Sequence, residues 1–289
     1  MTTESRAIFV ISDLHMGDGG PRDNFAVGKR ETQLSSFLDY VQQENGRLII
    51  LGDLFEFWQA SLGKVLMNRR SWLDRFTGIG GRYVVGNHDA DLGGLIGSDM
   101  LSHPFFRNMG RAFTEDIGAK RFRFMHGHEV DPFNCGDSPS WGRMLAIFAG
   151  IFEDRNGSPM LSEGVTVEEA LTKFGEVMLR LWNWLAKRIT PKVGDRKSAS
   201  PKNELTPSQN PDLAKKMLKE YEKERTKGGY DVLISGHTHQ AGRAGEWYLN
   251  SGCWAGATNN FVRISADGQG KVFDWRNGGP VANETVLSV

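Results

Sequence analysis

Six of the seven histidines in this 289-residue chain lie within a set of five short motifs, each of which follows a run of apolar residues. In chain order the motifs are Asp13-Leu14-His15, Gly52-Asp53, Gly86-Asn87-His88-Asp89, His126-Gly127-His128 and Gly236-His237-Thr238-His239. Histidine is the commonest metal ligand among side chains, and a carboxylate is the natural bridge between two cations. The concentration of histidines in these motifs therefore predicts an enzyme with a binuclear metal centre.

The spacing within the motifs predicts which residues bind the same cation. Asp13 and His15 are two residues apart, as are His237 and His239, and residues i and i+2 of a strand point to the same side. Each pair is therefore expected to bind one cation where a strand meets its loop. Asp53 follows a glycine that allows a tight turn, which leaves the carboxylate free to bridge both ions.

Asn87 and His126 complete the expected set with an amide oxygen and an imidazole nitrogen. A mixed oxygen and nitrogen set without thiolates favours Mn²⁺, with Fe, Zn²⁺ and Co²⁺ as alternatives. Two such ions about 3.5–4 Å apart can activate a water molecule and hold a phosphoryl group for in-line attack. The expected chemistry is metal-assisted hydrolysis of a phosphate ester.

The elements that must position these residues are predicted from hydrophobic periodicity. The expected strands that end beside a motif are residues 7–11, 47–51, 82–85, 121–125 and 231–235. The motifs therefore lie at strand carboxyl ends, where open α/β sheets bind their ligands. Between the first two strands, apolar residues at helical spacing predict a helix over residues 31–44 that packs on the sheet.

The remaining elements suggest two sheets. The steps from His15 to Asp53, to His88 and to His126 are nearly equal, which predicts one strand-crossover-strand unit per interval. After the last motif, strands are expected at 247–250, 261–265 and 271–275 with only Gly and Asn turns between them, so we expect an antiparallel second sheet. The predicted fold class is α/β, a two-sheet β-sandwich flanked by helices.

A change of pattern predicts an insertion. Residues 1–134 and 230–289 are expected to form the catalytic core, and residues 135–229 an inserted helical lid. Within the lid we expect apolar helical segments, then a loop rich in proline and lysine at 190–211, and a charged helix at 212–227.

The net charge, the apolar runs and the cysteines of the chain exclude some classes of protein. The formal net charge is zero, which argues against a dedicated nucleic-acid binder. The polar amino terminus shows no secretory signal, and the longest apolar run, 144–152, is too short to cross a bilayer. The two cysteines, Cys135 and Cys253, match no metal-binding or redox spacing, which favours a reducing compartment. We expect a globular protein of the cytoplasm.

The ordered motifs D-x-H, G-D, G-N-H-D, H-G-H and G-H-T-H resemble those of the calcineurin-like metallophosphoesterase superfamily over residues 5–133 and 230–275. The resemblance implies two groups of metal ligands, the first Asp13, His15, Asp53 and His239, and the second Asp53, Asn87, His126 and His237. It also implies that His88 contacts a phosphoryl oxygen and can protonate the leaving group.

The run Gly52-Asp53-Leu54-Phe55-Glu56-Phe57-Trp58 and the helical insertion are similar to the UDP-2,3-diacylglucosamine pyrophosphohydrolases of lipid A synthesis, in which a helical lid covers acyl chains. The similarity implies a phosphodiester or pyrophosphate substrate, with a nucleotide-linked lipid as one candidate, and allows peripheral contact with the inner membrane. Two departures from that family's pattern, His88 in place of arginine and His128 in place of aspartate, keep a second substrate class open.

That second class is a phosphatase or phosphodiesterase that acts on soluble small molecules or phosphoproteins. An alternative of another kind is an inactive metal-bound scaffold that docks other proteins. Such scaffolds usually lose a metal ligand, and here every expected ligand is present. The sequence therefore favours an enzyme.

Three residues near the motifs have open roles. His128 can orient His126, contact substrate or cap its loop. Asp89 can hydrogen-bond His88 and fix its tautomer, or be only a turn residue. Arg22, in the glycine-rich loop after the first motif, can contact substrate phosphate or remain solvated.

Overall fold

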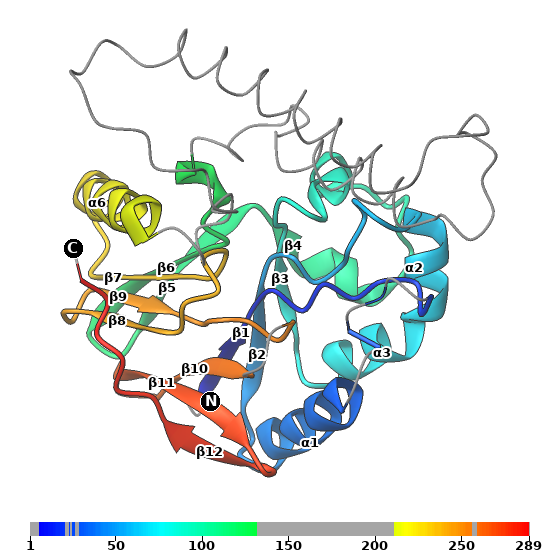
Figure 1. Ribbon diagram of the computed structural model, residues 1–289, viewed down its shortest axis with the longest axis horizontal. Helices are drawn as coiled ribbons and strands as arrows, with labels where there is room; N and C mark the ends of the chain where they lie inside the picture. Colours follow the sequence, from blue (N-terminus) through cyan, green and yellow to red (C-terminus); the bar gives the residue numbers. More distant parts are fainter. Residues whose placement is uncertain are drawn as a thin grey trace, which may run out of the picture. The chain divides into compact units, whose positions relative to one another are not determined.

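The computed structural model describes residues 6–20, 23, 25, 26, 29–131, 211–255 and 259–288. Within these residues, one seven-stranded sheet and one five-stranded sheet contain all the strands (Figure 1). Both sheets are mixed, and each has adjacent parallel strands whose carboxyl ends carry the predicted motifs.

The first sheet has the order β12-β11-β10-β1-β2-β3-β4. Its parallel strands are β1 (Ile8–Ile11), β2 (Arg47–Leu51), β3 (Arg82–Val84) and β4 (Met109–Gly110). Its antiparallel strands are β10 (Asn260–Ile264), β11 (Gly270–Arg276) and β12 (Gly279–Ala282).

The second sheet has the order β5-β6-β7-β9-β8. Its parallel strands are β6 (Lys120–Met125), β7 (Val232–Ser235) and β9 (Tyr248–Asn250). The antiparallel edge strands are β5 (Ala112–Ile117) and β8 (Gly242–Ala244).

Strand β1 shows why the sheets pack face to face. All four of its residues are buried, and successive side chains of a strand point to opposite faces. Phe9 and Ile11 belong to the apolar cluster that contains the buried residues of α1 and α3, whereas Ile8 and Val10 join a cluster shared with strands of the second sheet. A strand that is apolar on both faces needs cover on both sides, here helices and another sheet.

Helices cover the outer faces. On the first sheet, the cluster includes buried residues of α1 (Arg30–Gln43), α2 (Leu62–Asn68) and α3 (Arg70–Gly78). On the second sheet, α6 (Pro211–Gly228) buries Met217, Leu218 and Tyr221 against β7 and β9 residues. Short 3₁₀ helices are η1 (Ala90–Leu95), η2 (Pro104–Asn108) and η3 (His128–Val130).

The predicted sandwich of two sheets flanked by helices is confirmed, but its last strands were assigned to the wrong sheet. Strands β10 and β11 do not form an antiparallel second sheet, because β10 pairs antiparallel with β1 and extends the first sheet. Only β9 of the three expected strands lies in the second sheet, where it is parallel to β7. A strand's residue pattern does not specify which sheet edge it joins.

The regular crossover pattern is also wrong in its third interval. Strands β1, β2 and β3 are parallel neighbours as expected, but β6 lies in the other sheet. The chain between β3 and β6 forms η1, η2, β4 and β5 and crosses from one sheet to the other.

Most of the predicted lid lies outside the described residues. Residues 211–228, near its carboxyl end, form α6, which packs on the second sheet. The boundaries at 135 and 229 stay predictions. Among the residues that the structure describes, no helix is both long and apolar enough to span a membrane.

Candidate metal centre

The five motifs meet at the carboxyl ends of strands from both sheets. The motifs follow β1, β2 and β3 of the first sheet and β6 and β7 of the second. The loops are tied together by backbone hydrogen bonds, since Asp13 N donates to Gly52 O, His15 N to Asp53 O, and Gly236 N to His126 O. All seven predicted metal-ligand residues are therefore found in one region of the molecule.

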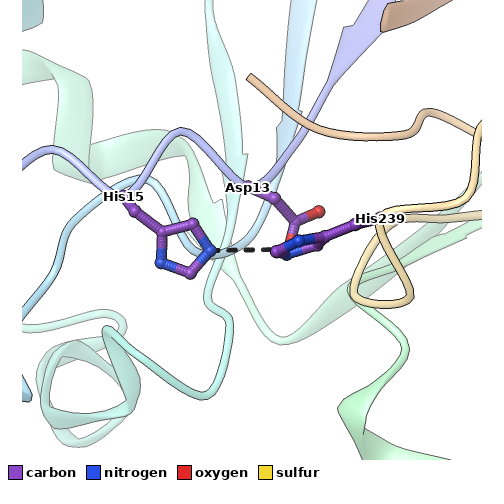
Figure 2. Close-up of side chains that lie close together, drawn as sticks. All are labelled: Asp13, His15 and His239. Carbon is purple, nitrogen blue, oxygen red and sulfur yellow. Dashed lines mark hydrogen bonds and ion pairs between the residues drawn. The ribbon is translucent and has the colours of Figure 1, made fainter. Parts of the chain in front are cut away.

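One group of side chains consists of Asp13, His15 and His239, whose ligand atoms lie within 4.8 Å of one another. Figure 2 shows both imidazole rings beside the Asp13 carboxylate. The Asp13 Oδ1 atom is 3.1 Å from His239 Nε2 and 4.0 Å from His15 Nε2. Asp13 is fully buried, whereas the His239 side chain is 32% exposed, so this group is accessible from the His239 side.

A second group consists of Asp53, His126 and His237, all of them buried, again with ligand atoms within 4.8 Å of one another. Asn87 joins it through Oδ1, which is 3.1 Å from His126 Nε2. The Asp53 Oδ2 atom is 3.2 Å from His126 Nε2 and 3.9 Å from His15 Nε2. This carboxylate thus lies between the two groups, as the bridging position requires.

Where the strands end, the backbone of several predicted ligands is left-handed, which the sequence analysis did not predict. Of the seven described non-glycine residues with positive φ, five are Asp13, His15, Asp53, His237 and His239. A non-glycine residue in the left-handed region costs about 1–2 kcal/mol, and such strain clusters at functional sites. The paired ligands converge through these turns rather than through strand alternation.

Two glycines make room for the carboxylate between the groups. Gly52 has a φ of +77°, and a Cβ atom there would lie 2.4 Å from the His126 ring. A Cβ atom on Gly86 would lie 2.2 Å from Asp53 Oδ1 and 2.4 Å from Asp53 N. Any larger residue at either position would displace a predicted ligand.

The donor set fits divalent cations. His15 Nε2 is buried and has no hydrogen-bond partner among the described residues, although it faces Asp13 and Asp53. Burial opposes protonation of His15, but the hydrogen bond to Glu56 and the charge of Asp53 raise its pKa to about 9. Burial likewise opposes protonation of His126, yet Asp53 raises its pKa to about 10. Buried carboxylates that hold protons on neighbouring imidazoles form a site that favours positive charge.

In three of the histidines, one ring nitrogen is hydrogen-bonded to a group outside the set of predicted ligands. His126 Nδ1 donates to the Leu51 carbonyl oxygen at 2.6 Å. His15 Nδ1 donates to Glu56 Oε2 at 3.2 Å, and His237 Nε2 is 2.8 Å from Asp131 Oδ2. Such partners fix the tautomer and orientation of metal-binding imidazoles.

The sequence analysis missed both supporting acids. Glu56 lies three residues after Asp53, inside the run that carries the family resemblance, and it is 9% exposed. Asp131 lies five residues after His126 and is fully buried. The available signal was an acid close to a histidine motif in a segment with few other charges, but such acids are usually solvated.

His88, in the third motif, contacts Glu56, and its surroundings decide between the two roles left open for Asp89. Its Nδ1 atom is 2.7 Å from Glu56 Oε2, so Glu56, and not Asp89, makes the expected hydrogen bond. The two Asp89 oxygens instead accept from Gly86 N and Phe55 N, which makes this residue the predicted turn former. Burial and the charge of Asp53 raise the pKa of Asp89 to about 6.

Two further histidines, His128 and His103, lie outside the predicted ligand set. The His128 and His126 ring centroids are 5.4 Å apart, and the partner of His126 Nδ1 is the Leu51 carbonyl oxygen rather than His128. Burial lowers the pKa of His128 to about 4. His103, outside the motifs, caps η2 by accepting from Phe105 N and contacts Asp74. Arg22 lies outside the described residues.

Comparisons of the amino-acid sequence with known proteins give two matches. A family model described as calcineurin-like phosphoesterase matches residues 7–241. UDP-2,3-diacylglucosamine hydrolase of Porphyromonas gingivalis is 24% identical over 127 residues, which cover 42% of this chain and 46% of that protein. The chain thus spans about half the length of the curated relative that it matches.

Solved structures with related chain traces include a Vps29 single mutant from Entamoeba histolytica, at 16% identity and a TM-score of 0.43, covering 96% of this chain and 97% of that one. A dimetal phosphatase from Danio rerio has 13% identity and a TM-score of 0.39, covering 94% and 99% of the two chains.

Proposed function

Because this chain belongs to the calcineurin-like phosphoesterase family, we propose that it hydrolyses phosphoesters with two divalent metal ions. The observation that carries the proposal is the position of Asp53 Oδ2, within 4.0 Å of a histidine from each ligand group. A carboxylate between two imidazole-containing groups is suited to bridge two cations.

In this proposal the first ion is held by Asp13, His15, Asp53 and His239, and the second by Asp53, Asn87, His126 and His237. The oxygen and nitrogen donors favour Mn²⁺, with Fe, Zn²⁺ or Co²⁺ as alternatives. When bound, such a pair supplies a nucleophile at neutral pH and neutralises the charge that develops on the phosphoryl group.

His88 is proposed to serve the leaving group. Its Nδ1 atom is occupied by Glu56, so Nε2 is the nitrogen left to face substrate. Its backbone N–H donates to Asp53 Oδ1 at 2.8 Å, which ties its position to the bridging residue. A histidine fixed in this way can stabilise a phosphoryl oxygen or give a proton to the departing oxygen.

We favour a phosphodiester or pyrophosphate as substrate. A hollow of about 410 Å³ borders His239, and its walls include Arg276, Asn283 and Thr285. A monoester carries one substituent on its phosphoryl group, whereas a diester or pyrophosphate carries a second, which this hollow can hold. The matched relative is named a UDP-2,3-diacylglucosamine hydrolase, which supports a nucleotide-linked lipid as one candidate.

The test is a panel of initial rates with Mn²⁺ on bis-p-nitrophenyl phosphate, p-nitrophenyl phosphate and UDP-2,3-diacylglucosamine, with Asp53→Ala as the blank. We expect the diester or the UDP-lipid to be preferred over the monoester. Preference for the monoester would favour the alternative, a phosphatase on soluble small molecules or phosphoproteins. No turnover of any substrate by the metal-loaded protein would favour the inactive scaffold.

A further inference from the structure

Trp58 packs directly against the proposed leaving-group histidine. Its indole is stacked on the His88 imidazole, with ring centroids 3.6 Å apart and an angle of 20° between the planes. The His15 ring meets the same imidazole edge-on, at 4.5 Å and 88°. His88 is therefore covered on one face by Trp58, contacted by His15, and hydrogen-bonded at Nδ1 by Glu56.

Trp58 is itself fixed by two hydrogen bonds that lead back to the site. The indole Nε1 donates to the Asn87 carbonyl oxygen at 3.1 Å, and the backbone N–H donates to Glu56 Oε1 at 3.0 Å. The same segment is linked by Phe57 N, which donates to His88 O at 3.3 Å. The indole is thus held relative to a predicted metal ligand and to the acid that binds His88.

The stack restricts the rotation of the His88 ring. The χ2 torsion of histidine has broad minima, so one hydrogen bond at Nδ1 leaves the ring free to tilt about it. A flat aromatic side chain against one face removes that freedom, because a tilted imidazole would clash with the indole. The direction of His88 Nε2 then depends on Trp58 as well as on Glu56.

We propose that Trp58 is a positioning residue that sets the plane of the His88 imidazole for proton transfer to the leaving oxygen. The inference rests on the proposed function, in which His88 serves the leaving group. Trp58 would then matter most when the leaving group needs a proton, and little for the metal ions or for substrate affinity.

The experiment compares Trp58→Leu and Trp58→Phe with the wild type on two diesters of similar shape. The p-nitrophenolate of bis-p-nitrophenyl phosphate departs without much help, whereas the phenolate of diphenyl phosphate is a poorer leaving group. General acid catalysis typically contributes about 10²–10⁴-fold, so Trp58→Leu is expected to lower kcat on diphenyl phosphate by about 10-fold or more. On bis-p-nitrophenyl phosphate we expect a change of less than about 3-fold, with KM unchanged on both.

Trp58→Phe retains an aromatic face and is expected to recover most of the lost rate on diphenyl phosphate. Trp247→Leu is the matched control, because Trp247 packs on Tyr248 and Arg225, away from the motifs. Metal content and melting temperature are measured for each variant, so that misfolding and metal loss are recognised directly.

Equal losses on both diesters, an effect on KM alone, or loss of metal from Trp58→Phe and Trp58→Leu would overturn the inference. If wild-type protein loaded with metal hydrolyses none of the two diesters, p-nitrophenyl phosphate and UDP-2,3-diacylglucosamine, the proposed function fails instead, and this is known before any variant is compared.

Discussion

Three histidines of the candidate centre, His15, His126 and His237, each depend on a partner that the cluster itself does not supply. The backbone holds His126, whereas side-chain carboxylates hold His15 and His237. A carboxylate partner makes an imidazole a stronger ligand than a backbone carbonyl does, because it supports the positive charge that metal binding places on the ring. The two buried acids, Glu56 and Asp131, are therefore expected to tune metal affinity from outside the ligand set.

Asp131 gives the clearer test, because its carboxylate is fully buried and 2.8 Å from His237 Nε2. Asp131→Ala is expected to weaken binding of one of the two ions by about 10–100-fold, the usual range for loss of such a partner. Asp131→Asn keeps an oxygen acceptor and should lose less. Titration of the metal-free protein with Mn²⁺ or Co²⁺ measures the affinity.

The control for this series is Asp116→Asn, since Asp116 is exposed on β5. Unchanged affinity for both ions in a folded Asp131→Ala protein would mean that His237 keeps its orientation without the acid.

His88 poses a different question, because its ring lies within the same 4.8 Å limit of His15 and Asp53 that defines the other groups. If His88 serves the leaving group and not a metal, His88→Ala should bind two ions and lose about 10²-fold or more in kcat. The measurement pairs elemental analysis of bound metal with initial rates. A variant that loses one ion would identify His88 as a ligand, and one with full activity would remove it from the mechanism.

At the scale of elements, the centre depends on how closely the turns after β2 and β3 approach each other. Gly86 has no room for a side chain, because a Cβ atom would lie 2.2 Å from Asp53 Oδ1. Gly86→Ala is therefore expected to displace the bridging carboxylate and to lower metal affinity by at least about 10-fold, with a loss of stability typical of overpacking, about 1–3 kcal/mol.

Gly63→Ala is the matched control, because a Cβ atom there meets nothing within 4 Å and the residue lies in helix α2. It should leave metal binding intact and raise helix stability slightly. Calorimetric titration with Mn²⁺ and chemical denaturation compare the two variants. Wild-type affinity in Gly86→Ala would show that the turn can relax without moving Asp53.

Some features of the strands and turns were predictable from the sequence, and others were not. The strands before the motifs were predictable, because apolar runs that end at His and Asp residues are a local pattern. The ligand set stays a prediction, although the structure brings its side chains together. The partner of β10 was not, because pairing with β1 depends on contacts between residues far apart in the chain. Which of the two roles left open for Asp89 applies was not predictable either, because in space the carboxylate of Glu56 is the one that reaches His88 Nδ1.

The left-handed turns at Asp13 and His15 were not predicted, since Asp and His adopt positive φ more often than most residues but far less readily than glycine. Tertiary hydrogen bonds compensate their backbone strain, because the N–H groups of Asp13 and His15 donate to carbonyl oxygens of the chain after β2. Local patterns therefore identified the chemistry, and long-range contacts determined the geometry.

At the scale of the whole molecule, the centre joins the two sheets. Asp13, His15, Asp53 and Asn87 follow strands of the first sheet, whereas His126, His237 and His239 follow strands of the second. Ions held between these residues bind only when the sandwich is assembled, so their binding energy adds to the stability of the entire fold.

The expected outcome is a metal-dependent melting temperature. At an ion concentration about 100 times its Kd, binding stabilises the native state by about 2.7 kcal/mol. For a chain of this size class the melting temperature should rise by roughly 5–10 °C relative to chelator-treated protein. The same titration on Asp53→Ala, which lacks the carboxylate shared by both groups, should show little shift. An equal rise in both proteins would mean that the ions bind elsewhere, and no rise in the wild type would mean that the ions do not bind the folded protein in preference to the unfolded chain.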